Sequence, residues 1–554
     1  MAVASISRPR RTSFAGRPAW SLLVLAAAAV VAAPVVAVAV QAVTADDTTG
    51  LPRGLGSMVL TTIALLVSVA LGTLVVGGGL AWLVTAYRFP LRGILSWLLV
   101  LPLAMPTYIL GFVFLSTFDV GGPVHEWWRE AFGADAWIPG VRNLPACALV
   151  MSLTLFPYVY LMARAALLEQ STSTYDAART LGAGRVRTLL TVVLPLARPS
   201  LAAGLALVMM EVLTDFATVQ YFGVKTVSVG VYLTWKGSYD FEAATQLSML
   251  VLTFAVAVLA GERLMRGRSR YHQKGGRGQG MELQQLDGWR GWAATLVCLL
   301  ALSAAFLLPV ARLVGWAVAE ALDDSSSLVD PRFGEYLGNS LTVALVAAAG
   351  CVSVALVLGH ALRISGGRFQ RAAAQVTTFG YAVPGAVVGI GVLLAFDWLD
   401  RVLEWVGTGG TGLLVTGSVA GVLYAYLVRF LAPAYQAVDA SLAKVSPTMT
   451  LSALSLGASP RRVLTRVHLP LARSGVLVAV VMVVIDAVKE LPVVLMIRPF
   501  GFTTISVWVY QLASENFWEK AALPALLIVA AAIVPVFLLF RQVRLVDPHR
   551  SPVD

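Results

Sequence analysis

Long apolar segments recur along the whole chain and constrain its fold more than any other sequence feature. A helix of about 20 apolar residues crosses the roughly 30 Å hydrocarbon core of a bilayer with its backbone hydrogen bonds satisfied internally. We predict spans, in two sets of six, near residues 20–43, 57–86, 94–118, 143–168, 198–222 and 245–264, then 291–318, 338–362, 371–397, 412–440, 473–497 and 520–541. The chain is therefore expected to be an all-α polytopic membrane protein with about twelve transmembrane helices.

Composition and charge agree with a membrane location. The chain is 58% hydrophobic and 13% charged, which is too apolar for a water-soluble protein of 554 residues. Basic residues gather before the first span and in alternate loops, and acidic residues gather in the other loops. Because basic loops are cytoplasmic, both termini are expected in the cytoplasm of a bacterial inner-membrane protein. The formal charge of +11 follows from this orientation and predicts no nucleic acid partner.

The first apolar run and the cysteines could each suggest a different protein. The first run has an Arg-rich front, like a secretory signal peptide, but it is longer than the usual apolar core of one. We expect it to remain as a membrane helix, because its removal would break the six-plus-six pattern. Cys147, Cys298 and Cys351 lie singly in predicted spans. Their spacing predicts neither a disulfide nor a metal site, and no cofactor is expected.

The two sets of spans share sequence. Residues 180–183 recur as 455–458, at an offset of 457 − 182 = 275. Further segments match at nearly the same offset, namely 194–198 with 469–473 and 226–229 with 504–507. This predicts a duplicated and fused unit, with a first unit at 1–264, a basic Gly-rich cytoplasmic linker at 265–290 and a second unit at 291–554. With an even number of spans each, the units insert in the same orientation, related by a pseudo-two-fold axis along the membrane normal.

Proline and glycine recur in the third span of each unit. Pro106 and Gly111 match Pro384 and Gly389, at an offset of 384 − 106 = 278. Proline is a common cause of helix kinks, so these residues are candidates for helix bending at equivalent points. Close helix packing is the alternative role.

The longest predicted cytoplasmic loop of each unit lies between its fourth and fifth spans. In the first unit it reads Asp176-Ala177-Ala178, three residues, Gly182, nine residues, Val192, one residue, Leu194-Pro195. This pattern resembles the E-A-A-x3-G-x9-I-x-L-P loop of binding-protein-dependent ABC importer permeases, with Asp for Glu and Val for Ile. The resemblance implies two fused type I, MetI-like permease units, each with a short loop helix that contacts an ABC ATPase subunit.

The loop of the second unit departs from this pattern. It keeps the glycine and the Leu-Pro pair, but Leu451 stands where the acid would be, so contact with the ATPase is expected to be asymmetric. Basic side chains in both loops can pair with carboxylates of a partner. The predicted ATPase-coupling residues are Asp176, Ala177, Ala178, Gly182, Arg185, Leu194 and Pro195, with Ser452, Ala453, Gly457, Arg461, Leu469 and Pro470. An ordinary amphipathic loop helix is the alternative.

Ionisable residues inside the spans are candidates for a translocation path, because charges at bilayer depth are expensive. Glu211 and Asp215 lie four residues apart in the fifth span, on one helix face. Asp486 and Glu490 stand at the equivalent places in the eleventh span, where 486 − 211 = 275, with Lys489 beside them. Four carboxylates around a central path would suit a cationic or metal substrate. An interhelical structural network, with Lys489 neutralising one acid, is the alternative.

Around these acids the sequence resembles a narrower group of ABC importer permeases. The segments that carry it are 211–224, 489–492, 498–500 and 507–511. They look like those of the ferric-iron importer permeases, which are fused double-unit chains, and the likeness covers nearly the whole sequence. It implies a periplasmic or lipid-anchored iron-binding protein at the outer loops, and a homodimer of ATPase subunits on the cytoplasmic face. The loops 223–244 and 498–519, rich in Tyr, Trp and acids, are the docking candidates, with an interfacial aromatic belt as the alternative. The resemblance implies no iron ligands, and thiamine permeases share the fused layout.

Catalytic and nucleotide-binding motifs are absent from the sequence. There is no G-x-x-x-x-G-K-[S/T] loop to bind ATP and no catalytic or metal-binding His or Cys cluster, so we expect a transport subunit without its own ATPase site. The predicted function is the permease of a ferric-iron ABC importer. Thiamine or another small solute is the alternative cargo. A stand-alone twelve-helix secondary transporter is the rival from another class, and it would not need two matched cytoplasmic loops.

Overall fold

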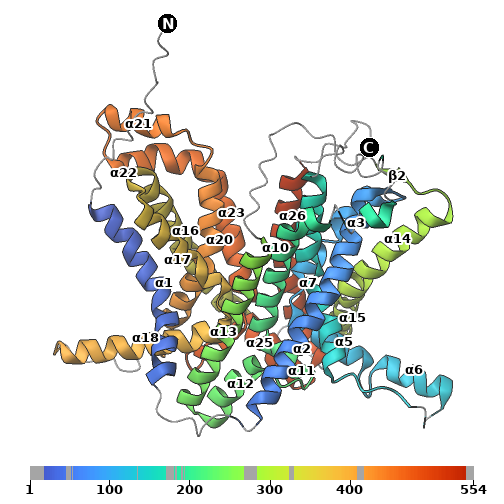
Figure 1. Ribbon diagram of the computed structural model, residues 1–554. Helices are drawn as coiled ribbons and strands as arrows, with labels where there is room; N and C mark the ends of the chain where they lie inside the picture. Colours follow the sequence, from blue (N-terminus) through green and yellow to red (C-terminus); the bar gives the residue numbers. More distant parts are fainter. Residues whose placement is uncertain are drawn as a thin grey trace.

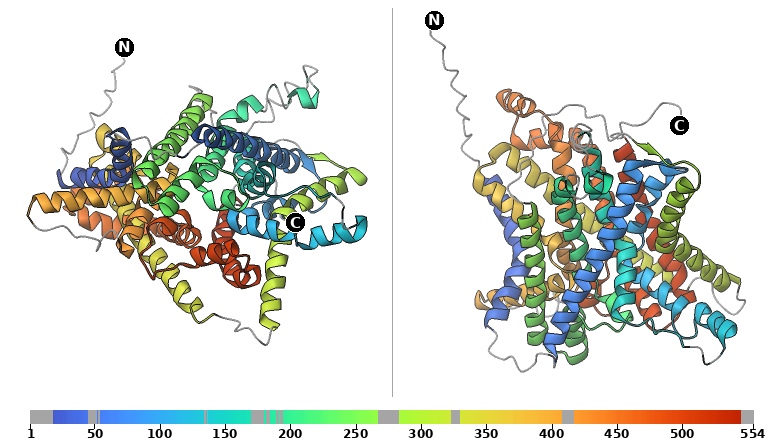
Figure 2. Two further views of the ribbon diagram at one scale, coloured as in Figure 1. Left: turned by 90° about the horizontal axis from the view of Figure 1, so that it is seen from below. Right: turned by 45° about the vertical axis from the view of Figure 1, so that its right-hand side comes forward.

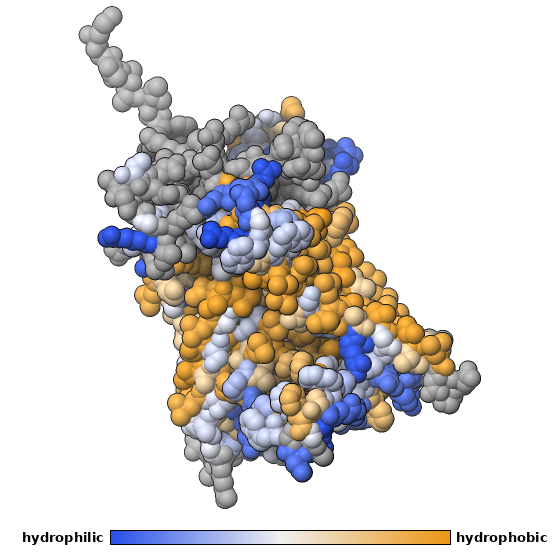
Figure 3. All heavy atoms as spheres, turned by 90° about the vertical axis from the view of Figure 1, so that its right-hand side faces the viewer, coloured by the Kyte–Doolittle hydropathy of each residue, from blue (hydrophilic) through white to orange (hydrophobic). Residues whose placement is uncertain are grey.

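A computed structural model describes the protein over residues 18–44, 52, 54–133, 135, 137–169, 180, 184–188, 191, 194–266, 283–322, 330–407 and 417–544 (Figure 1). Within these residues nine helical runs are long and apolar enough to cross a membrane, and ten if one bent pair counts as a span. Seen from the side, a band of hydrophobic side chains separates two more hydrophilic ends (Figure 3). The predicted all-α polytopic fold is confirmed.

The helices of the first unit follow the predicted order. They are α1 (Pro18–Thr44), α2 (Leu55–Thr73), η1 (Leu74–Gly78), α3 (Gly79–Ala86), α4 (Arg92–Leu98), η2 (Leu101–Ala104), α5 (Thr107–Phe118), α6 (Pro123–Phe132), α7 (Leu144–Glu169), α9 (Arg185–Thr188), α10 (Leu194–Thr214), α11 (Phe216–Tyr221), α12 (Val227–Leu233), η4 (Thr234–Ser238) and α13 (Phe241–Arg266).

The second unit repeats this order from α14 onward. Its helices are α14 (Trp289–Leu302), η5 (Ser303–Leu307), α15 (Leu308–Leu322), α16 (Phe333–Ser365), α17 (Arg368–Phe379), η6 (Gly380–Ala382), α18 (Gly385–Trp405), α20 (Val419–Leu442), α21 (Pro447–Ser455), α22 (Pro460–Val463), η7 (Leu464–His468), α23 (Leu469–Lys489), α24 (Pro492–Ile497), α25 (Ile505–Ser514) and α26 (Trp518–Arg544).

The third span of each unit, for which the sequence offered Pro106 and Pro384 as candidate points of bending, consists of separate helices. In the first unit the predicted span 94–118 breaks into α4, the turn η2 and α5. In the second unit the predicted span 371–397 bends by 118° between α17–η6 and α18. Pro106 and Pro384 stand directly before α5 and α18 with nearly the same backbone angles, φ −57° and −56° with ψ 140°. A helix ends before proline because the residue ahead of it is pushed out of the helical region.

The fifth span of each unit is also shorter than predicted. The predicted spans 198–222 and 473–497 each contain a break, since α10 stops at Thr214 and α23 stops at Lys489. A short helix follows each one, α11 in the first unit and α24 in the second. The prediction that Asp215 and Glu490 lie within a continuous helix is therefore wrong: Asp215 is the N-cap of α11, and Glu490 is the C-cap of α23.

The duplication extends to individual hydrogen bonds. The backbone N–H of Val227 donates to the hydroxyl of Thr62 at 3.0 Å, and that of Ile505 donates to Ser340 at 2.7 Å. Both pairs are related by the same offset, 340 − 62 = 278 and 505 − 227 = 278. Each bond joins the second span of its unit, α2 or α16, to the start of the short helix α12 or α25. Two matched bonds far apart in sequence show the same packing in both units.

The first helix of each unit packs against the other unit. Helix α1 contacts α16, α17, α18 and α20, while α14 and α15 contact α4 and α5. Side chains fix these crossings: the Tyr424 hydroxyl donates to the carbonyl of Val30 at 2.7 Å, and the Thr295 hydroxyl donates to that of Pro90 at 2.8 Å. The two chain segments are therefore interlocked, so the spatial halves of the bundle differ from the segments 1–264 and 291–554.

Both ends of the predicted linker have regular secondary structure. Residues 267–282 lie outside the described part of the chain, but α13 continues to Arg266 and β2 (Gln284–Gln285) pairs in parallel with β1 (Tyr87–Arg88). This pairing lies at the same end of the bundle as α21 and α22 (Figure 1). The prediction of a flexible tether over the whole of 265–290 is therefore wrong for residues near its two ends.

Two amphipathic segments project at the opposite end of the bundle. Helix α6 exposes Trp127 and Trp128, and the end of α18 exposes Trp405. They are equivalent in the duplicated unit, because 401 − 123 = 278, and seen from below they extend to opposite sides (Figure 2). Exposed tryptophans beside charged residues suit the boundary between lipid and water.

The Ser340 bond gives a test of the duplicated packing. Ser340 is 4% exposed, and in Ser340→Ala the buried N–H of Ile505 loses its acceptor, which costs about 1–3 kcal/mol. We expect the free energy of unfolding in detergent to fall by that amount. Thr253→Ala is the control, since this exposed hydroxyl bonds only the Met249 carbonyl one turn away, and a change within about 0.5 kcal/mol is expected. Equal unfolding energies for the two variants would contradict the assigned bond.

Candidate functional site: a charged cavity between the two units

A cavity of about 100 Å³ lies where the broken helices of the two units meet. The first unit contributes η2, α5, α7 and α10, and the second contributes η6, α20, α23 and the start of α24. The cavity is lined by Leu103, Met105, Pro106, Thr107, Tyr108, Thr154, Leu155, Tyr158, Glu211, Thr214, Asp215, Tyr381, Arg429, Phe430, Asp486, Lys489, Glu490, Leu491 and Pro492. All five ionisable residues proposed from the sequence therefore share one cavity.

Asp215 forms the break in the first unit. Its Oδ1 atom accepts a hydrogen bond from the backbone N–H of Thr218 at 2.9 Å, and the Thr218 hydroxyl donates to its other oxygen. Asp215 thus caps the N-terminus of α11, where aspartate is favoured because four backbone N–H groups lack partners. The carboxylate is held in place at the cavity wall.

Glu490 forms the equivalent break in the second unit, since 490 − 215 = 275. Its Oε1 atom accepts from the backbone N–H of Val493 at 3.2 Å, at the start of α24. The Ser506 hydroxyl donates to the Glu490 carbonyl at 2.8 Å, and the equivalent Ser228 hydroxyl donates to the Leu213 carbonyl at 2.7 Å. At each break, one backbone carbonyl and one backbone N–H therefore have a side-chain partner inside the protein, which lipid could not supply.

Arg429 is the one basic residue of the site that the sequence reasoning missed. It lies on α20, is 6% exposed, and its Nε atom lies 3.3 Å from Oε2 of Glu490. Gly385, the first residue of α18, leaves room for this pair, because a Cβ there would collide with Nη1 of Arg429. A single arginine within the apolar segment 419–442 was the available signal, since ionisable residues at membrane depth mark functional sites by default.

The charges of the cavity are distributed unequally between the units. Its lining holds four carboxylates and two basic side chains, a formal charge of 2 − 4 = −2. Both basic residues come from the second unit, where Lys489 Nζ lies 2.8 Å from Asp486 Oδ1 and Arg429 pairs with Glu490. In the first unit the residue equivalent to Lys489 is Thr214, since 489 − 214 = 275. Glu211 and Asp215 therefore have no basic partner from their own unit in the lining.

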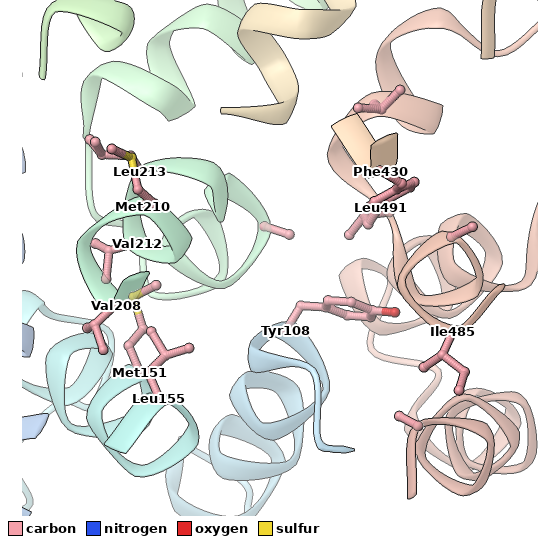
Figure 4. Packing of buried hydrophobic residues seen from close by; sticks show 14 of the residues in the cluster. Tyr108, Met151, Leu155, Val208, Met210, Val212, Leu213, Phe430, Ile485 and Leu491 are labelled. Atoms are coloured by element: carbon pink, nitrogen blue, oxygen red, sulfur yellow. The ribbon is translucent and has the colours of Figure 1, made fainter. Parts of the chain in front are cut away.

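Tyr108 stands between the two units in the cavity. Its ring projects from the start of α5 toward Ile485 and Leu491 of the second unit, with Met210 and Leu213 on the opposite side (Figure 4). The hydroxyl is buried and has no hydrogen-bond partner within the described residues. A buried hydroxyl without a partner is costly, so this oxygen is available to bind an ion or molecule in the cavity.

The glycines beside the two breaks have a packing role. A Cβ at Gly111 would lie 3.2 Å from the Thr218 side chain on α11, and one at Gly389 would lie 3.3 Å from the Met496 side chain on α24. These contacts are equivalent, because 496 − 218 = 278. The glycines let α5 and α18 lie close against the short capped helices.

The predicted coupling loop of the second unit forms a pair of short helices, α21 and α22. Helix α21 ends at Ser455, and Gly457 follows with φ +83°, a left-handed conformation that glycine adopts without strain. Ser452 and Arg461 are exposed, Ala453 is partly buried, and Leu469-Pro470 begins α23. The hollow on α21 is lined by Thr448, Leu451, Ser452, Ser455 and Leu456.

The corresponding loop of the first unit is described only in part. Asp176, Ala177, Ala178 and Gly182 lie outside the described residues. Arg185 begins the four-residue helix α9, and Leu194 with Pro195 begins α10, just as Leu469 and Pro470 begin α23. The two Leu-Pro pairs therefore mark the same point in the duplicated unit, where the loop re-enters the bundle.

The Arg429–Glu490 pair can be tested by a double substitution. Arg429→Met leaves a buried carboxylate without its cation, and loss of one partner from a buried pair costs about 3–5 kcal/mol. We expect the free energy of unfolding to fall by about that much, and Glu490→Gln in the same chain to restore most of it, because the buried charge is gone. A double variant that is no more stable than the single one would show that the two residues do not act as a pair.

Gly385 gives a second test of the same geometry. Gly385→Ala forces Arg429 or α18 to move, and overpacking of this kind costs about 1–3 kcal/mol. The matched control is Gly338→Ala in α16, where an added Cβ meets nothing within 4 Å, and where alanine is expected to be neutral or stabilising by about 0.5–1 kcal/mol. Thermal unfolding in detergent compares the two, and similar stability of both variants would contradict the close approach at Gly385.

Comparison with known proteins identifies the family. The model of the binding-protein-dependent transport system inner membrane component matches residues 73–261 and 351–552. A ferric iron transport system permease protein of Haemophilus influenzae is 24% identical over 86% of this chain and 88% of its own length. A sulfate transport system permease protein of Escherichia coli is 30% identical over 34% of this chain and 68% of its own length.

Other matches are more distant or partial. A molybdenum transport system permease protein of Escherichia coli is 29% identical over 34% of this chain and 82% of its own length. The crystal structure of a bacterial ABC transporter for alginate import matches 46% of this chain and 94% of its own chain, at 15% identity and a TM-score of 0.35. The family match covers both units and most of the chain. The chain therefore belongs to the family of binding-protein-dependent transport system inner membrane components, and it carries the family domain twice.

Proposed function

We propose that this chain is the permease of an ABC importer that carries ferric iron across the bacterial inner membrane. The observation that carries the proposal is the cavity between the units, whose carboxylates outnumber its basic residues by four to two. The relative that spans 86% of the chain is a ferric iron transport permease, which supports the same cargo. A sulfate or molybdenum permease matches only one unit's length of the chain.

The first unit supplies the face that receives the cation. Hard cations prefer oxygen ligands, and Glu211 offers a carboxylate that lines the cavity without a basic residue of its own unit beside it. Asp215 offers a second carboxylate held by α11, and Tyr108 offers a hydroxyl that has no partner among the described residues. The acids of the second unit are engaged by Lys489 and Arg429. The cargo therefore enters the cavity beside Glu211. It leaves when the two units move apart at the opposite end of the bundle from the one at which it entered.

The energy comes from a separate subunit at the end of the bundle that holds α21 and α22. We place this end in the cytoplasm, together with both termini, where a homodimer of ATPase subunits contacts the two coupling loops. A periplasmic or lipid-anchored binding protein docks at the opposite end, on the loops around α12 and α25. Closure of the ATPase dimer moves the coupling loops, and the capped breaks at Asp215 and Glu490 let the units open alternately to the two sides. Family membership favours this scheme over a stand-alone secondary transporter.

Neutralising Glu211 tests the proposed path. In Glu211→Gln the shape of the side chain is kept but its charge is lost, so we expect ATP-driven uptake of radioactive ferric iron into proteoliposomes to fall at least about tenfold, the effect of losing about 1.4 kcal/mol of attraction. Glu335→Gln on the exposed first turn of α16 is the matched control, with uptake expected within about twofold of the unsubstituted protein.

The outcomes of this experiment separate the claims about cargo and mechanism. Equal uptake by both variants would remove Glu211 from the path. Uptake driven by an ion gradient without the ATPase would favour a secondary transporter. Identification of the solute that the cognate binding protein retains on purification tests the cargo itself: ferric iron supports the proposal, and thiamine or an oxyanion overturns it.

A further inference from the structure

Two buried histidines connect the second coupling loop to helix α16. The Nδ1 atoms of His360 and His468 lie 2.9 Å apart, and both side chains are fully buried. Nε2 of His468 lies 3.0 Å from the hydroxyl oxygen of Thr450, which is 6% exposed on α21. These three residues belong to α16, η7 and α21, so one chain of polar contacts joins the loop helix α21 to the bundle.

One set of neutral tautomers satisfies both contacts of this chain. The Thr450 hydroxyl donates to Nε2 of His468, and the Nδ1–H of His468 donates to Nδ1 of His360. His360 then carries its proton on Nε2, which is buried and has no hydrogen-bond partner within the described residues. Buried polar groups are costly unless they are hydrogen-bonded, so displacement of α21 alone would leave a second imidazole nitrogen, Nε2 of His468, unpaired. Helices α21 and α16 are therefore favoured to move together.

Helix α16 extends from these histidines to the opposite end of the bundle. Near its inner end, Arg363 Nη1 also donates to the carbonyl of Val445, just before α21, at 3.0 Å. At its outer end, Ser340 accepts from Ile505 at the start of α25. The Tyr510 hydroxyl on α25 in turn donates to Oε1 of Gln220 in the first unit at 2.9 Å. Helix α16 thus links the coupling loop to the contact between the two units.

We propose that His360, His468 and Thr450 form a relay of positioning residues that transmits motion of α21 to α16. This inference rests on the coupling role proposed above for the loops. The repeat offsets place Trp82 and Val193 at the positions of the two histidines in the first unit, where 360 − 278 = 82 and 468 − 275 = 193. The relay lies in the second unit, whose loop has Leu451 where the leading acid would be. It gives this loop a rigid connection to α16 in place of the charged contact that the acid would make with the ATPase.

The test measures communication across the membrane in the reconstituted full transporter. Thr450→Val removes the hydroxyl but keeps the shape, and Thr450→Ser keeps the hydroxyl. We expect Thr450→Val to retain basal ATP hydrolysis and to lose stimulation by the loaded binding protein by about tenfold, within the range of coupling between distant sites. Thr450→Ser is expected to retain stimulation. His468→Gln, which cannot contact both neighbours, is expected to behave like Thr450→Val.

A packing role for the same residues predicts different results. The double variant His360→Phe, His468→Phe fills the same space without polar atoms, and melting temperatures in detergent report its stability. The relay requires that this variant stay folded and uncoupled. Full stimulation in the double variant, or in Thr450→Val, would overturn the relay. Absence of stimulation in the unsubstituted transporter would instead contradict the proposed importer function, so the two failures are distinguishable.

Discussion

The structure depends on how a polypeptide can interrupt a helix inside a membrane. Backbone N–H and C=O groups that a break sets free have no water to bond in lipid, so each must find a partner within the protein. At the two breaks the carboxylates of Asp215 and Glu490 accept backbone N–H groups of the next helix, and Ser228 and Ser506 donate to carbonyls beside them. The short capped helices α11 and α24 then pack on Gly111 and Gly389. A cavity results at the point where both units are interrupted.

The duplicated unit places equivalent helix breaks on both sides of the cavity, and the differences between the two units determine the charge of its lining. The four acids and the two serines occupy equivalent positions in the two units. The basic residues are found in the lining from the second unit alone, where Arg429 and Lys489 each pair with an acid. One wall is therefore internally neutralised and the other is acidic. The coupling loops diverge in a parallel way, since the second unit lacks the leading acid and has a buried histidine pair.

Much of this arrangement could be predicted from sequence because it repeats. The offset of 275 to 278 residues paired Glu211 with Asp486 and Asp215 with Glu490, and the apolar runs predicted the order of helices. The breaks were missed because an acid in an apolar run carries no sign of whether it lies within a helix or caps one. Arg429 was missed because it has no equivalent in the repeat. The pairing of His360 with His468 could not be foreseen, since residues 108 apart meet only through the packing of α16 against η7.

The central claim is that α21 and its equivalent loop face the compartment that holds the ATPase. Labelling of single cysteines in membrane vesicles of known orientation tests this claim most directly. Cys147, Cys298 and Cys351 are fully buried, so single exposed cysteines can be labelled with a membrane-impermeant thiol reagent. Ser452→Cys lies on α21, and Tyr239→Cys lies at the opposite end, where the side chain is 84% exposed. The account predicts labelling of Ser452→Cys in inside-out vesicles and of Tyr239→Cys in right-side-out vesicles. Labelling of Ser452→Cys from the outside would contradict it.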